Sequence, residues 1–163
     1  MPALASAAER TRQLRVIWIA MVAAMAVYWI IRILAAPRSA SLMWPAPLPV
    51  ALLVLAIGDY ALAWWWYQRG IGQVVRRLTP TTIQQLSGAE RRDIADRVFA
   101  SVIACFACLE VPVLLGLLNS FGVSTMPRLF EALALSSVAG MVLFRLKALP
   151  GITALLESLL AAP

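Results

Sequence analysis

Charged residues are scarce in this sequence, and histidine is absent. Only 13% of the 163 residues are charged, whereas a soluble domain carries about 25%. Without histidine the chain has no imidazole metal ligand and no histidine general base. We recognise no nucleophile–base pair, metal-binding cluster or phosphate-binding loop. The sequence therefore predicts neither an enzyme nor a bound cofactor.

Hydrophobic residues are abundant and lie in long blocks. They make up 62% of the chain, and the mean hydropathy is +0.83. About 20 apolar residues cross the hydrocarbon core of a bilayer as a helix. We therefore predict an all-α, polytopic membrane protein with four transmembrane helices in two hairpins. Residues 1–163 form a single transmembrane domain, with spans at about 16–35, 50–67, 98–118 and 129–144.

The basic residues predict the orientation of these spans. Of the 14 Lys and Arg residues, 11 lie in the N-terminal lead, the polar segment 68–97 and the end of the fourth span. Arg32, Arg38 and Arg128 lie on the other side. Because cytoplasmic flanks are enriched in Lys and Arg, we expect a multi-pass protein of the inner (cell) membrane with both termini and segment 68–97 in the cytoplasm. The net charge of +6 follows this pattern and does not indicate nucleic-acid binding.

Two acidic residues interrupt the apolar spans. Glu110 lies in the middle of the third span and Asp59 in the middle of the second. Each is nine residues from the outer end of its span, which is about 13 Å along a helix. A charged residue at this depth is a functional-site hypothesis because it is costly to insert. If the two helices pack as a hairpin, the carboxyls lie at one depth and can share a proton.

Arg32 lies about one turn below the outer end of the first span and can reach the same level. The three residues together predict a buried carboxylate site that is linked to protons or cations. Two alternatives remain open. Arg32 can pair with one acid in a purely structural cluster, or Asp59 and Glu110 face different places while Arg32 extends to the headgroups.

Small residues recur along the third span. Ala100, Ala104 and Cys108 are spaced four residues apart, and such stripes allow membrane helices to approach closely. We expect this stripe to support a homo- or hetero-oligomer. Pro112 leaves a backbone carbonyl near Cys108 without its helical donor, which suits either cation binding or a kink in the helix.

The two cysteines, Cys105 and Cys108, form a C-x-x-C pair within the same span. On a helix their sulfurs are neighbours, so a membrane thiol redox protein is one alternative function. A thiol oxidase of the four-helix membrane type needs a second cysteine pair, and this chain has none. Both thiols therefore favour a packing role.

Segment 68–97 is the only long polar stretch. Within it, Ser87 followed by Glu90 is typical of a capping box, and we expect the helix that starts there to continue into the third span. A structural or accessory subunit whose cytoplasmic segment docks a partner is therefore a further alternative function.

The third span resembles the carboxylate helix of the proteolipid c subunits of rotary ATPases. The resemblance rests on Ala100-Ser101, Ala104, Ala107, Leu109-Glu110-Val111-Pro112 and Gly116-Leu117-Leu118. It implies that Glu110 is a proton- or sodium-binding carboxylate. The opening LRVIWIAMVAAMAVYW and the late Gly-Leu-Leu are also similar to a loosely defined group of small bacterial four-span membrane proteins.

The chain departs from the rotor pattern in its second span. A c subunit carries a glycine repeat on its inner helix, whereas this span has only Gly58 and three consecutive tryptophans. The Arg-Gln-Pro turn of that family is also missing. The resemblance therefore implies a site like that of a c subunit and not a rotor ring.

Overall fold

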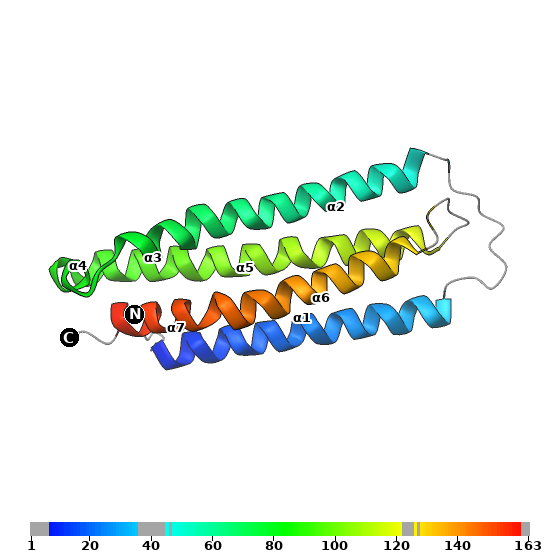
Figure 1. The fold of residues 1–163 in the computed structure, drawn as a ribbon. Coiled ribbons are helices and arrows are strands. Elements are labelled where there is room, and N and C mark those ends of the chain that lie inside the picture. The colour runs from blue at the N-terminus through cyan, green and yellow to red at the C-terminus, as the bar shows by residue number, and fades with distance from the viewer. Residues whose placement is uncertain (1–6, 36–44, 46, 122–125, 127, 161–163) are drawn as a thin grey trace.

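The chain folds as an elongated bundle of helices (Figure 1). The computed structural model describes residues 7–35, 45, 47–121, 126 and 128–160, so Arg38 lies outside the described residues. The described part contains helices and no β-strand. Four helices are long and apolar enough to cross a membrane: α1 (Ala7–Ala35), α2 (Pro47–Trp66), α5 (Gly88–Asn119) and α6 (Leu129–Lys147). The predicted all-α fold with four span-like helices is confirmed.

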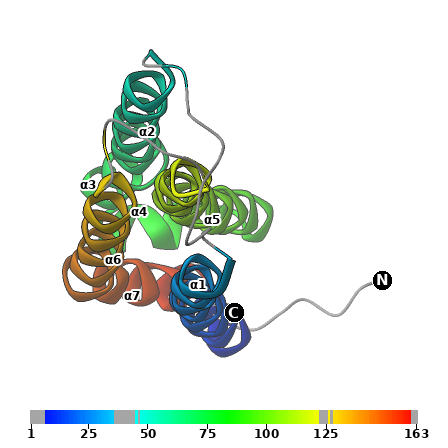
Figure 2. The same ribbon diagram turned by 90° about the vertical axis from the view of Figure 1, so that its right-hand side faces the viewer.

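Helix α5 occupies the centre of the arrangement. Seen along the bundle, it lies between α2 and α1, with α6 beside it (Figure 2). Consecutive long helices run antiparallel, as expected of two hairpins (Figure 1). However, α1 packs against α5, α6 and the short helix α7 (Leu149–Leu160), and not chiefly against its chain neighbour α2.

A capping box starts α5. The Ser87 hydroxyl accepts a hydrogen bond from the backbone N–H of Glu90, and the Glu90 carboxylate accepts one from the backbone N–H of Ser87. These bonds satisfy donors that have no partner at a helix start. The helix then continues through Pro112 to Asn119, so the expectation of one unbroken helix is confirmed. Its 32 residues span about 48 Å, which exceeds the bilayer core of about 30 Å.

The polar segment after α2 folds into short helices. These are a π-helical turn, η1 (Tyr67–Gly72), then α3 (Gln73–Arg77) and α4 (Pro80–Gln85). Together with α7 they form what we call the cap, at one end of the bundle (Figure 1). The apolar side of α7 contributes Ile152 and Leu156 to a core shared with Ile71, Ile83 and Val98. Segment 68–97 is therefore a packed structure and not an open loop.

Two glycines permit close contact between α5 and its neighbours. A Cβ atom at Gly70, in η1, would lie 2.0 Å from the Ser101 hydroxyl of α5. A Cβ atom at Gly116, in α5, would lie 2.9 Å from the backbone Cα of Phe130 in α6. Real Cβ atoms do not approach other atoms so closely, so both positions require glycine for this packing.

Candidate functional site

Glu110 is hydrogen-bonded to a tyrosine of the first helix. The Tyr28 hydroxyl of α1 donates to Oε1 of Glu110 at 2.6 Å. Glu110 lies nine residues before Asn119, so α5 carries it well inside its apolar part. The bond joins two helices whose surfaces are otherwise apolar at this level. Glu110 therefore has a defined neutral donor and no cationic partner among the described residues.

Arg32 pairs with Glu131, a residue of α6 that the sequence analysis did not single out. Their side chains form a salt bridge and are 26% and 30% exposed. The guanidinium of Arg32 also lies over the Phe130 ring, 5.2 Å from its centroid, and over the Trp29 ring at 5.9 Å. Such cation–π contacts add attraction at a site with little water. Glu131 could have been found as an acid in the first turn of the fourth span, level with Arg32.

Tyr28 and Arg32 lie on one face of α1 because they are four residues apart. Tyr28 reaches α5 through Glu110, and Arg32 reaches α6 through Glu131. We call these four residues the polar cluster. Two of its atoms, Nε of Arg32 and Oε2 of Glu131, are buried and have no hydrogen-bond partner within the protein. The cluster therefore links three helices and retains capacity for further hydrogen bonds.

Asp59 lies on the other side of α5 from the polar cluster. In the packing of α2 against α5, the Cys105 thiol donates to the carbonyl of Ala63 at 3.4 Å. One turn further from the cap, Asp59 lies within electrostatic range of Cys108. Cys108 and Glu110 are two residues apart, about 200° around the helix. Asp59 and Glu110 are thus nearly level, but they face different neighbours.

Asp59 forms no hydrogen bond or ion pair with the described residues. The structure therefore joins α1 to Glu110 through Tyr28, and it brings neither Arg32 nor Asp59 into a polar contact with Glu110. Neither alternative left open by the sequence occurs in full: Asp59 and Glu110 face different neighbours, but Arg32 pairs with Glu131. The partner of Arg32 is neither of the two acids considered.

The expectation of a carboxylate buried within the chain is wrong. Among the described residues no Asp or Glu is buried, and Glu110, Asp59 and Glu131 are partly exposed. The spacing of residues along a span gives the distance of each acid from the end of that span. It does not indicate whether a neighbouring helix covers the acid, and here each acid lies on a flank that faces the lateral surface.

Cys105 and the stripe of Ala100, Ala104 and Cys108 differ in their exposure. Cys105 is 1% exposed and lies against Ala63. Cys108 is partly exposed, Ala104 likewise, and Ala100 is exposed. Both thiols are free, with no disulfide. Cys105 is thus a packing residue between α2 and α5, and the stripe faces partly outward.

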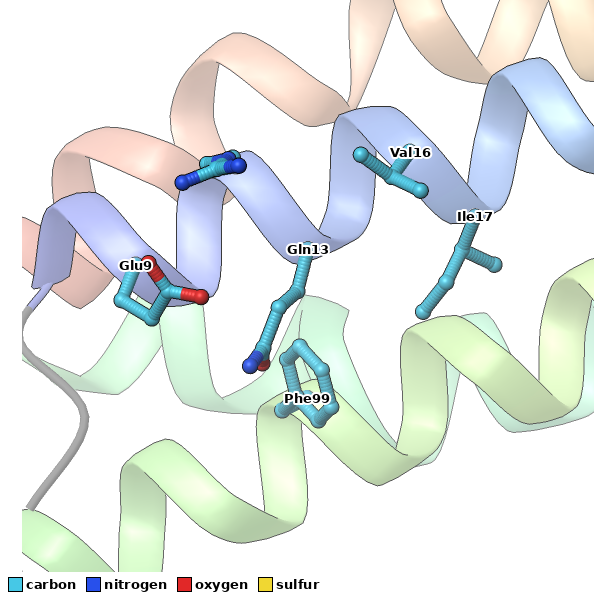
Figure 3. A pocket seen from close by; sticks show the side chains of 6 residues that line it. Glu9, Gln13, Val16, Ile17 and Phe99 are labelled. Atoms are coloured by element: carbon cyan, nitrogen blue, oxygen red, sulfur yellow. The ribbon is translucent and has the colours of Figure 1, made fainter.

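An open hollow also lies between α1 and α5 near the cap (Figure 3). Its volume is about 460 Å³, and its lining includes Glu9, Gln13, Val16 and Phe99. Beside it, Arg10 pairs with Asp96 at 2.6 Å. The lining also includes Arg12, so it combines one acid, one cation, one amide and apolar groups. It holds no nucleophile next to a base, so it offers no arrangement for catalysis.

No protein-family model, curated protein or solved structure matches this chain.

Proposed function

We propose that this chain is a small integral membrane protein in which Glu110 binds a proton or a cation. The observation that carries the proposal is the hydrogen bond from Tyr28 to a carboxylate inside a span-like helix. Arg32 pairs with Glu131 and lies over two rings, so among the described residues no cation neutralises Glu110. A carboxylate in hydrocarbon without a cation is stabilised by taking up a proton or a metal cation.

The partial exposure of Glu110 also supports this proposal. A carboxyl that exchanges protons or cations must be reachable, and Glu110 is neither sealed inside the bundle nor bonded to more than one described side chain. Tyr28 supplies one fixed donor and leaves the second carboxylate oxygen available. The resemblance to rotary c subunits is consistent with this role and stays a proposal. The present site differs in that its donor comes from another helix of the same chain.

The proposed orientation places the cap in the cytoplasm of a cell whose inner membrane holds the protein. It is supported by the basic residues, which concentrate at the cap and the adjoining helix ends. A Ser87→Cys variant in a background without Cys105 and Cys108 tests it in intact cells. Ser87 is exposed. We expect no labelling by a membrane-impermeant thiol reagent, and labelling from outside would contradict this topology.

Carbodiimide labelling tests the role of Glu110, because carbodiimides attack protonated carboxyls in an apolar setting. We expect mass spectrometry to find Glu110 modified faster at low pH than at high pH. If the site binds sodium, sodium chloride should slow the reaction more than choline chloride does. Glu110→Gln should abolish the modification, whereas Glu157→Gln, at an exposed position of α7, should not. Resistance of Glu110 at every pH would contradict the proposal.

A structural role is the second candidate, and the Arg32–Glu131 salt bridge favours it. In that case the polar cluster holds α1 in place and Glu110 contributes only its bond to Tyr28. The chain would then be a structural or accessory subunit whose cap docks a partner, and it would associate through the stripe of Ala100, Ala104 and Cys108. Wild-type behaviour of Glu110→Gln in every ion-dependent assay, with normal assembly, would support this candidate.

A further inference from the structure

A second cavity lies between α2 and α6, away from the polar cluster. Its volume is about 550 Å³. At its end farther from the cap, the Tyr60 hydroxyl is hydrogen-bonded to Ser136 at 2.6 Å and to Ser137 at 2.9 Å. Nearer the cap, the rings of Tyr67 and Phe144 meet edge to face, with centroids 5.9 Å apart. These two contacts join α2 to α6 at the two ends of the cavity. We call the cavity between them the α2–α6 groove.

The α2–α6 groove has an apolar lining and opens sideways. Cys105 and Leu109 of α5 line it from behind. Trp64 and Leu143 line it at the lateral surface, where their side chains are 63% and 53% exposed. This is the surface that lipid chains cover in a span-like bundle. In a membrane-spanning bundle the groove would therefore open toward the acyl chains of the bilayer.

A cation lies at the cap end of the groove. Lys147, the last residue of α6, lines the groove, is exposed and forms no salt bridge with the described residues. Arg69 follows Tyr67 by two residues, and its guanidinium lies over the Trp65 ring at 5.0 Å. An apolar groove that ends at an unpaired cation matches an amphiphile with an apolar chain and an anionic head.

We propose that the α2–α6 groove binds one acyl chain of an anionic phospholipid, with the headgroup phosphate on Lys147. The size of the groove favours a chain over a helix. Tyr60 and Tyr67 are seven residues apart, about 10 Å along α2, and both ends are closed by side-chain contacts. A partner helix is about 10 Å wide and continues past both ends, so it does not fit, whereas a flexible hydrocarbon chain does.

The headgroup assignment is tested by native mass spectrometry of the full chain released from nanodiscs. The discs contain equal amounts of phosphatidylglycerol and phosphatidylcholine. We expect wild type to retain phosphatidylglycerol preferentially. Lys147→Gln should reduce that retention about fivefold, as expected for one lysine near an anionic surface. Lys147→Arg should keep it. Arg92→Gln, which removes an exposed charge of α5 outside the groove, should change it little.

The chain assignment is tested by filling the groove. Leu143→Trp should reduce retention of both lipids, whereas Leu135→Trp, at an exposed position of α6 outside the groove, should not. Equal retention of phosphatidylglycerol by wild type and Lys147→Gln would overturn the proposal. Displacement of the bound phosphatidylglycerol by inorganic phosphate alone would also overturn it. Glu110→Gln should retain lipid like wild type, so the result is independent of the proposed ion site.

Discussion

The two sides of α5 are held to their neighbours by different means. On the α2 side the contacts are small and steric: Cys105 lies against Ala63, and Ser101 lies against Gly70. On the α1 side, the Tyr28 hydroxyl binds Glu110. Helix α1 also reaches α6 through a salt bridge from Arg32. Against α5, α2 is thus held chiefly by close packing, whereas α1 also has the hydrogen bond to Glu110.

The difference follows from how much of each helix is covered. In the most apolar 18-residue window of α1, 6% of the residues are buried, against 39% in α5. Apolar side chains gain little by leaving lipid, so membrane helices associate through packing and polar bonds. A helix with few packed residues needs polar bonds to stay in place. We infer that the polar cluster orients α1.

The largest expected effect on stability comes from disrupting the close packing on the α2 side of α5. Gly70→Ala places a Cβ atom 2.0 Å from the Ser101 hydroxyl and 2.5 Å from its Cβ. Overpacking of this kind should lower the free energy of unfolding by about 3 kcal/mol. Unfolding in mixed detergent micelles measures it. Gly58→Ala is the matched control because nothing lies within 4 Å of its added Cβ. Adding Ser101→Gly to Gly70→Ala should recover part of the loss, and no recovery would contradict the steric explanation.

The next largest effect on stability is expected from breaking the salt bridge between Arg32 and Glu131. Arg32→Ala leaves the Glu131 carboxylate without its cation and should cost about 2 kcal/mol. Adding Glu131→Gln should restore part of that stability, because position 131 then carries no ionised acid without its cation. A double-mutant cycle in the same micelles measures the coupling. Strictly additive losses would show that Arg32 acts through its ring contacts alone.

A smaller effect is expected for the cysteines on the α2 side. Cys105→Ala combined with Cys108→Ala removes two sulfur atoms but no charge and no strong hydrogen bond. We expect a loss of about 1 kcal/mol and unchanged function. The same unfolding measurement, with an ion-binding assay, checks this. Loss of a thiol-dependent activity in that variant would restore the redox alternative.

The smallest expected effect on stability comes from removing the hydrogen bond between Tyr28 and Glu110. Tyr28→Phe removes the hydroxyl that donates to Glu110 and leaves the ring in place. Interhelical hydrogen bonds in membranes average about 0.6 kcal/mol, so we expect a loss of that size. Tyr60→Phe is the comparison on α2, where the hydroxyl binds two serines. A much larger loss for Tyr28→Phe would mean that this bond alone positions α1.

The fold was predictable where the sequence carries local signals. The capping box at Ser87 and the length of the apolar blocks predicted α5 and the number of spans. The side on which each polar residue lies was not predictable. In a span that is apolar all round, no stripe of hydrophobic residues distinguishes the packed face from the lipid face. The depths of Asp59 and Glu110 could therefore be estimated, but not that they face different helices.

The partner of Arg32 was missed for a related reason. Its identity depends on α1 lying beside α6, which is not its neighbour in the chain. No pattern within α1 indicates that contact. The short helices of the cap were also not visible, because segment 68–97 is polar and its apolar residues pack against α5 and α7 only in the folded chain.

The most direct test of the central claim is infrared spectroscopy of the reconstituted protein during a pH titration. The account predicts that the protonated-carboxyl absorption growing as the pH falls contains a band of Glu110, which the difference between wild type and Glu110→Gln isolates from the other acids. Asp59→Asn, at the same level on the other side of α5, should leave that band in place. A band that persists in Glu110→Gln and disappears in Asp59→Asn would contradict the assignment of Glu110 as the titrating group.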